Sequence, residues 1–129
     1  MTTTTPFPGI AAPFLQGLFR DGVPEDLRFE PMQGDGRQDI DIHRLYTTAQ
    51  TGSTGPSAGI VRYHPGASAA PHVHPGFELI YVFDGALEFD ERTFGPGSVI
   101  VMEPGSTHAP ASPAGCTLLV VWEQPVARA

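Results

Sequence analysis

Glycine and proline make up a large share of this chain, and they constrain its fold more than any other feature. The 129 residues include 15 glycines and 14 prolines. Both residue types interrupt long helices, and the dipeptides Pro65-Gly66, Pro96-Gly97 and Pro104-Gly105 are typical of tight turns. The sequence therefore favours many short strands joined by turns.

The stretches between these turns have the residue pattern of β-strands. From residue 40 onward, apolar and polar residues alternate with a period of two, or apolar β-formers run together. The pattern predicts strands over 40–46, 59–64, 78–83, 87–89, 93–94, 99–102 and 117–122. Strands at intervals of about ten residues with no helices between them predict an all-β fold, a small antiparallel sandwich or barrel.

The chain divides into an N-terminal arm and a barrel. Residues 1–39 form the predicted arm, which has a short helix over 13–19, and residues 40–129 form the barrel. The arm carries four large apolar side chains that a barrel of this size would leave partly unburied. We therefore expect a homodimer to which the arm contributes. The four side chains are Phe14, Leu15, Leu18 and Phe19.

Charge and cysteine content exclude several classes of partner. The formal net charge is −7. This excess of acidic over basic residues argues against nucleic acid or an anionic membrane surface as a partner. The chain has no apolar run of about 18 residues, so no membrane span is expected. The single cysteine, Cys116, cannot form an intrachain disulfide, which fits a reducing cytoplasm.

A cluster of metal-ligand residue types lies in the apolar β-region. His72 and His74 form an HxH pair, whose side chains share one face of a strand. Glu78 begins the next strand, and His108 follows a Pro-Gly turn that could return it to the pair. Imidazoles and one carboxylate are typical ligands of a divalent first-row transition metal.

These residues resemble the motifs of the cupin superfamily. From Gly66 to Gly85 the chain reads glycine, five residues, HxH, three residues, glutamate, six residues and glycine, as in the first cupin motif. Gly97, Gly105 and His108 fall at the spacings of the second motif.

The second motif departs from the usual pattern at two positions. Glu103 stands where proline is usual, and Ser112 replaces asparagine. The resemblance implies a jelly-roll barrel that holds one divalent ion through His72, His74, Glu78 and His108. It implies no organic cofactor.

A narrower resemblance concerns the segments on either side of the metal motifs. Residues 62–68 and 112–119 are similar to cupins fused to zinc-dependent anti-sigma factors, and to their stand-alone relatives. Those relatives include diketone- and hydroxyacetophenone-cleaving dioxygenases. The chain shows no second Cys/His cluster ahead of the cupin motifs, so we do not expect a sigma factor as partner.

Three functions remain open from the sequence. A divalent ion with three neutral imidazoles and one carboxylate carries a net charge of about +1, which suits an enolate or another bidentate mono-anionic oxygen ligand. With Fe(II), we expect a dioxygenase acting on a small carbonyl or phenolic compound. With Zn(II) or Mn(II), we expect a redox-neutral isomerase, lyase or cyclase. The third possibility is a protein that binds a small molecule or senses a metal without turnover.

The pattern also names candidate residues around the ion. Glu78, Arg62 and His64 are candidate catalytic residues, and period-two geometry places Arg62 and His64 on the same strand face. Apolar side chains with suitable strand parity are expected to line the substrate pocket; they are Ile80, Val82, Met102, Leu118 and Val120. Three aromatic residues are expected near its mouth, and they are Tyr46, Tyr63 and Phe77.

Overall fold

The structure is a computed structural model that describes residues 14–34 and 36–129. Within these ranges the chain is mostly β-structure, with two one-turn helices, α1 (Leu18–Asp21) and α2 (Thr48–Thr51). The strands are β1 (Glu30–Pro31), β2 (Gln38–Tyr46), β3 (Ser57–Ser68), β4 (His72–Val73), β5 (Glu78–Gly85), β6 (Leu87–Phe89), β7 (Arg92–Phe94), β8 (Val99–Met102), β9 (Thr107–His108), β10 (Ala111–Ser112), β11 (Cys116–Trp122) and β12 (Ala127–Arg128).

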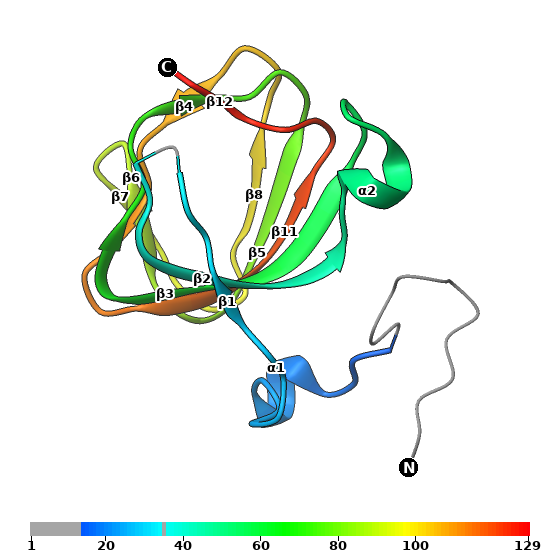
Figure 1. Cartoon of the computed structure of the whole chain (residues 1–129). Coiled ribbons are helices and arrows are strands. Elements are labelled where there is room, and N and C mark those ends of the chain that lie inside the picture. The colour runs from blue at the N-terminus through cyan, green and yellow to red at the C-terminus, as the bar shows by residue number, and fades with distance from the viewer. Residues whose placement is uncertain (1–13, 35) are drawn as a thin grey trace.

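The strands form two antiparallel sheets that enclose one interior. The larger sheet has nine strands, with the main order β7-β6-β10-β3-β11-β5-β8; β2 pairs with β3, and β1 pairs with β2. The smaller sheet has the order β12-β4-β9. Figure 1 shows the larger sheet curling around the interior while β4 and β12 cross its upper end. The predicted all-β antiparallel barrel is confirmed.

Alternation along the strands fills this interior with apolar side chains. In β8, Ile100 and Met102 point inward and are buried, whereas Val99 and Val101 point outward and are exposed. Full burial of one such aliphatic side chain stabilises the fold by about 1.5–3 kcal/mol. The hydrophobic core continues along β2, β3, β5 and β11. The barrel therefore has a continuous apolar core that does not depend on its polar residues.

Turn residues set the connections between strands. The hairpin between β6 and β7 turns on Asp90 and Glu91, which have φ values of 52° and 60°. Two consecutive residues with positive φ are typical of the type I′ turn that joins two-residue hairpins. The hairpin predicted at this position is therefore confirmed, and its turn is one residue shorter than expected because Arg92 already belongs to β7.

Two sequence predictions about local structure were wrong. The helix begins at Leu18, after Gly17 with φ 71°, and not within 13–17; residue 13 lies outside the described residues. Strand β3 does not end at Pro65-Gly66 but continues to Ser68. Gly66 takes a φ of 87°, so the strand passes through the dipeptide with a local bend that only glycine adopts easily.

The segment before residue 40 contributes to the barrel. Strand β1 pairs with β2, and Met32 packs against the core. The division into an arm (1–39) and a barrel (40–129) stays a prediction. In the described ranges, neither helix is long and apolar enough to cross a membrane.

Candidate metal centre

The four predicted metal ligands lie together inside the barrel. The strand β4 carries His72 and is followed at once by His74, β5 begins with Glu78, and β9 ends with His108. The pairing of β4 with β9 places His72 opposite His108. One ligand atom from each of the four residues lies within 4.8 Å of the other three, and all four residues are buried.

Hydrogen bonds to the backbone orient two of the imidazoles. His72 Nδ1 donates to the carbonyl oxygen of Ala70 at 3.2 Å, and His74 Nδ1 donates to that of Ser106 at 2.9 Å. Because Nδ1 carries the proton, the Nε2 atom of each neutral ring keeps a free lone pair. A hydrogen bond from the other ring nitrogen is the usual way in which proteins fix the orientation and tautomer of a histidine ligand.

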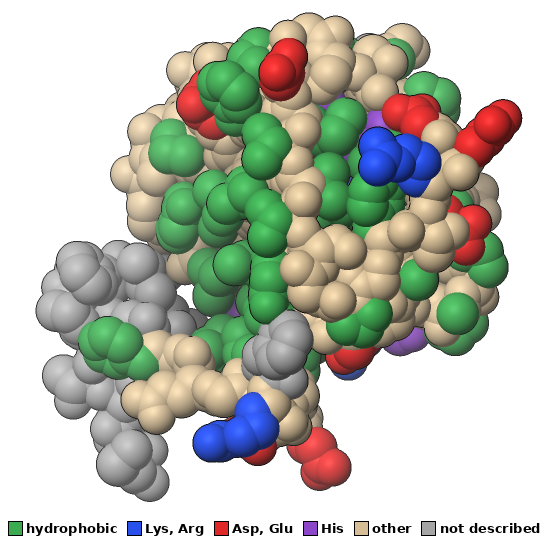
Figure 2. Space-filling view, turned by 180° about the vertical axis from the view of Figure 1, so that it is seen from behind, with side chains coloured by type: hydrophobic (Ala, Val, Ile, Leu, Met, Phe, Trp, Pro, Cys, Tyr) green, Lys and Arg blue, Asp and Glu red, His purple; other side chains and the backbone are tan. Residues whose placement is uncertain are grey.

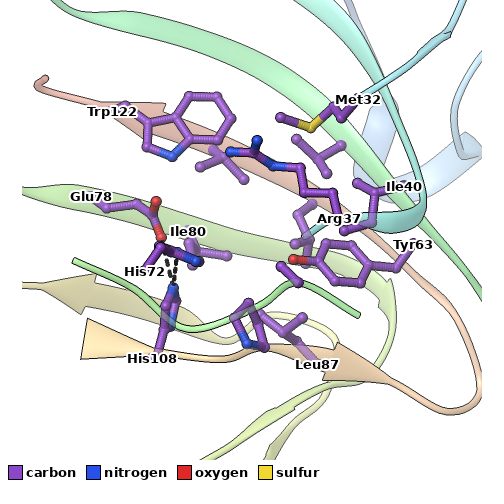
Figure 3. Close-up of a pocket in the computed structure, with 15 residues that line it drawn as sticks. Met32, Arg37, Ile40, Tyr63, His72, Glu78, Ile80, Leu87, His108 and Trp122 are labelled. Atoms are coloured by element: carbon purple, nitrogen blue, oxygen red, sulfur yellow. Dashed lines mark hydrogen bonds and ion pairs between the residues drawn. The ribbon is translucent and has the colours of Figure 1, made fainter. Parts of the chain in front are cut away.

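The free lone pairs converge on one point. His72 Nε2 and His108 Nε2 lie 2.8 Å apart, and Glu78 Oε1 lies 3.5 Å from His108 Nε2 (Figure 3). Glu78 Oε1 also lies 3.4 Å from His74 Nε2. His74 Nε2 is buried and has no hydrogen-bond partner among the described residues. A buried, unpaired acceptor costs free energy unless something binds it. Nitrogen and carboxylate donors in this arrangement fit a divalent transition-metal ion.

The two departures from the second cupin motif do not disturb this geometry. The backbone N–H of Ser106 still closes the turn on the carbonyl of Glu103, and the N–H of Gly105 donates to the carbonyl of His74 at 2.7 Å. Ser112 is fully buried, and its hydroxyl donates to the carbonyl of Ala86. The turn that carries His108 is therefore tied to the HxH segment even without the usual residues.

Burial and mutual contact shift the acid–base equilibria of these groups. Burial alone would raise the pKa of the Glu78 carboxyl, but His108 and His74 beside it outweigh burial and lower that pKa to about 2. Burial, followed by the nearby His108, lowers the pKa of His72. Burial also opposes protonation of His74, but the adjacent Glu78 carboxylate and the Ser106 carbonyl raise its pKa above the ordinary value.

Metal occupancy is expected to fall when the pH is lowered from about 8 to about 5. Because its pKa is raised, His74 takes up a proton early as the pH falls, and the proton occupies the lone pair that a metal needs. Glu78 stays ionised over this range because its pKa is about 2. Metal content after dialysis at each pH measures the effect, with circular dichroism as the control for folding. Equal occupancy at both values would contradict histidine ligation.

A narrow cavity of roughly 30 Å³ reaches the cluster from the barrel interior. His72, Glu78 and His108 lie at one end of it (Figure 3). Most of the other lining side chains are apolar or aromatic. They are Met32, Arg37, Ile40, Val61, Tyr63, Ala69, Ile80, Leu87, Pro110, Leu118, Val120 and Trp122. A ligand at the cluster would therefore meet apolar walls and little water.

Half of the predicted pocket residues line this cavity. Those that do are Tyr63, Ile80, Leu118 and Val120. Val82 and Met102 are instead buried in the core, Tyr46 lies near the end of β2, and Phe77 is 49% exposed in the turn before β5. Strand parity identifies inward-facing residues, but it does not say how far along the barrel axis each one lies. That these four residues contact a substrate stays a prediction.

Arg62 and His64 share one strand face, as predicted, and it is the outer face. Both contact the carboxylate of Asp41: His64 Nε2 lies 2.6 Å and Arg62 Nη2 lies 3.6 Å from Oδ2. The Arg62 guanidinium also stacks on the Phe29 ring at 4.0 Å. Neither side chain lines the cavity, and their catalytic role stays a prediction.

Sequence reasoning missed eight of the fifteen described residues that line the cavity: Met32, Arg37, Ile40, Val61, Ala69, Leu87, Pro110 and Trp122. Met32 and Arg37 belong to a segment that reads as a polar, glycine-rich turn and carries no motif. Trp122 is the last residue of β11. Met32 and Arg37 reach the cavity through the long-range pairing of β1, β2 and β3, which no local signal predicts. Trp122 continues the inward parity of Leu118 and Val120 along β11, and that signal could have found it.

The sequence matches the family model of the ChrR cupin-like domain over residues 23–127. The chain belongs to this cupin family. The match covers most of the barrel and the segment before it, so the resemblance inferred from the motifs is confirmed. A comparison with curated proteins found no significant match.

Solved structures of other cupins have the same fold. The polyketide cyclase RemF from Streptomyces resistomycificus is 25% identical over 80% of each chain, with a TM-score of 0.66. An acetylacetone dioxygenase from Acinetobacter johnsonii is 17% identical over 81% of this cupin and 72% of that chain, with a TM-score of 0.69.

A third similar structure is the complex of SigE with the anti-sigma ChrR from Rhodobacter sphaeroides. The identity is 23%, the TM-score is 0.61, and the match covers 76% of this cupin. This cupin spans about half, 49%, of the chain matched in that complex. At this identity the likeness shows a shared fold alone.

Proposed function

We propose that this cupin is a metal-dependent enzyme that acts on a small enolisable carbonyl or phenolic compound. The observation that carries the proposal is a buried His₃Glu cluster at the end of an apolar cavity. A site of this kind holds a carbon skeleton against apolar walls while its oxygen atoms meet the cluster. The cyclase and dioxygenase similarities are consistent with such chemistry.

The residues of the site have two different roles, binding of the ion and contact with the substrate. His72, His74, Glu78 and His108 would hold the ion. A bound divalent ion supplies Lewis-acid chemistry that favours an enolate, and iron adds redox chemistry with O₂. Tyr63 lines the cavity and keeps its proton, because burial and then the charge of Glu78 raise the pKa of its hydroxyl. It is thus a neutral hydrogen-bond donor for a substrate oxygen.

Oxidation by a dioxygenase-type reaction is the first candidate, and it requires iron. A redox-neutral isomerase, lyase or cyclase with zinc or manganese is the second candidate. The second is favoured by the structural match to RemF, which has the highest identity of the solved structures described above. Both candidates use the same ligands and the same apolar walls, so the metal decides between them.

The metal that co-purifies, together with O₂ consumption, tests these candidates. Protein purified without added metal is analysed for its elements, and then assayed with a panel of diketones and hydroxyketones in air and under anaerobic conditions. Iron with substrate-dependent O₂ uptake supports the dioxygenase. Product formation that persists without O₂ supports the redox-neutral enzyme. Tight binding without turnover of any compound would contradict both and leave a binding or sensing protein.

We also propose a homodimer, which uses an exposed apolar face of the large sheet. Leu79 of β5 lies opposite Val101 of the edge strand β8, and Val99 lies beside them; these side chains are 42%, 56% and 62% exposed. Phe14, in the predicted arm, is 68% exposed. Figure 2 shows hydrophobic side chains gathered on one face of the molecule. A symmetric contact between two such faces buries both.

Light scattering at micromolar concentration is expected to give the mass of a dimer. Val101→Glu should shift the protein to monomer without changing its circular dichroism spectrum, because Val101 points away from the core. Glu103→Gln, at a nearby exposed position, is the matched control and should remain dimeric. A monomeric mass for the wild type would refute the proposal.

A further inference from the structure

The cavity beside the metal cluster is enclosed by buried residues except on one side. Of the fifteen described residues that line it, twelve are buried and three are only partly buried. The three are Met32, Arg37 and Trp122. The same three residues also line a more open hollow of roughly 200 Å³. The open hollow is therefore the side from which a ligand reaches the cluster.

Strand register places Trp122 between the two spaces. Its neighbours across the sheet are Glu78 of β5 on one side and Ser57 of β3 on the other. Glu78 belongs to the cluster and lines the inner cavity, whereas Ser57 lines the open hollow. Residues directly opposite each other in an antiparallel pair project their side chains from the same face of the sheet. The Trp122 indole therefore lies beside the Glu78 side chain (Figure 3).

The side chains of Trp122 and Met32 are held in place by apolar packing. Both pack against the hydrophobic core, and within residues 14–34 and 36–129 no hydrogen bond, ion pair or ring contact fixes either side chain. The backbone after Trp122 is fixed, because the N–H of Glu123 donates to the carbonyl of Phe77 at 2.9 Å. The indole can therefore change rotamer without breaking a polar contact and without disturbing the strand.

The inner cavity is too small for a carbon skeleton while the indole stays in place. Its volume of roughly 30 Å³ holds about two water molecules, because one water needs about 10–15 Å³. The open hollow beside it is several times larger. Rotation of the Trp122 side chain away from Glu78 would join the two spaces, and a larger compound could then reach the cluster from the open hollow.

We infer that Trp122, together with Met32, is the gate of the metal site and determines which sizes of ligand reach the ion freely. A ligand about as large as two water molecules passes to the cluster with the indole in place. A larger compound enters only after the indole has turned away. This inference rests on the metal site of the proposed function, but it does not depend on turnover. Trp122 is then a specificity-determining residue that does not ligate the ion.

Azide and benzohydroxamate test the inference with a small and a large ligand of the ion. Azide is a small linear anion, and benzohydroxamate is a bidentate oxygen ligand that carries a phenyl ring. Stopped-flow absorption of the Co(II)-loaded protein follows the association of each. Trp122→Ala is expected to raise the association rate constant of benzohydroxamate by at least about tenfold, because entry no longer waits for a conformational change. The rate constant of azide should stay within about twofold of the wild-type value.

Two further variants test the same gate. Trp122→Phe keeps a smaller ring in place, so the rate constant of benzohydroxamate should lie between those of the wild type and Trp122→Ala. Met32→Ala opens the gate from its other member and should also raise that rate constant. If Trp122→Ala does not fold, these two variants decide the question.

Phe83→Ala is the matched control, because Phe83 is a partly buried aromatic residue of β5 that contacts Tyr81 and lines neither hollow. It should leave both rate constants unchanged. Cobalt content and circular dichroism of each variant show that the cluster and the fold persist. If folded, cobalt-loaded gate variants admit benzohydroxamate at the wild-type rate, or accelerate azide equally, the inference is overturned while the proposed function stands. If the wild type binds no cobalt, the inference and the proposed function both fail.

Discussion

His74→Ala is expected to abolish metal binding while the barrel stays folded. His74 Nε2 is buried without a hydrogen-bond partner, and the Nδ1 contact with Ser106 aims its lone pair at the cluster. Removing a hydrogen-bond partner that orients a metal ligand commonly weakens metal binding by about 10–100-fold. Removing the ligand itself should therefore weaken metal binding by at least about 100-fold. Elemental analysis after gel filtration measures the loss, and turnover should fall with it.

His43→Ala is the matched control for this experiment. His43 lies on β2 and its Nδ1 contacts the carbonyl of Arg28 at 2.9 Å, so the same substitution removes an imidazole and a hydrogen bond outside the cluster. Its metal content should equal that of the wild type. Full occupancy in His74→Ala would mean that the ion sits elsewhere, and the proposed centre would be wrong.

The sequence predicted the barrel and the cluster because both depend on short-range patterns. Strands 78–83, 99–102 and 117–122 are apolar, β-branched and bounded by Gly or Pro, and the observed strands match them to within two residues at each end. His72 and His74 share a strand face by geometry. His108 follows a turn whose backbone hydrogen bonds hold it beside His74. The resemblance to cupins implied this proximity, whereas the local sequence pattern alone could only suggest it.

What the sequence could not predict depends on contacts between distant segments. Pro65-Gly66 normally ends a strand, but the pairing of β3 with β10 holds Ala67 and Ser68 in the sheet beyond it. Arg37 sits in a turn with no motif, and only the bond from Ala70 to Gly36 shows that the turn lies beside the cluster. Parity correctly placed Ile80 and Leu118 inward, but it does not say which of the inward-facing core residues also line the cavity.

Glu78→Gln is expected to separate function from folding. Glutamine keeps the shape of the side chain but removes the negative charge, so the ion should bind more weakly and the site should become more positive. The lowered pKa of Glu78 shows that the carboxylate is ionised at neutral pH and interacts with His74 and His108. Loss of one electrostatic contact of this kind typically lowers turnover by about 100-fold or more. Glu103→Gln, an exposed site with the same charge change, should leave turnover unchanged.

The fold of the Glu78→Gln protein should survive, because the core consists of apolar side chains on β2, β3, β5, β8 and β11 and not of metal ligands. A chain of this length buries enough surface to fold without an ion, unlike a zinc finger. If the substitution lowers the free energy of unfolding by about 1 kcal/mol, the melting temperature falls by only about 4 °C. Bound metal adds about 3–4 kcal/mol by mass action when free metal is about 100–1,000 times its Kd. Circular dichroism melts of the wild type and the variant, each with and without metal, compare the effect of the substitution on stability with the effect of bound metal. If the metal-free wild type or the variant is unfolded at room temperature, the ion is a structural element of the barrel and the proposed enzyme loses its main support.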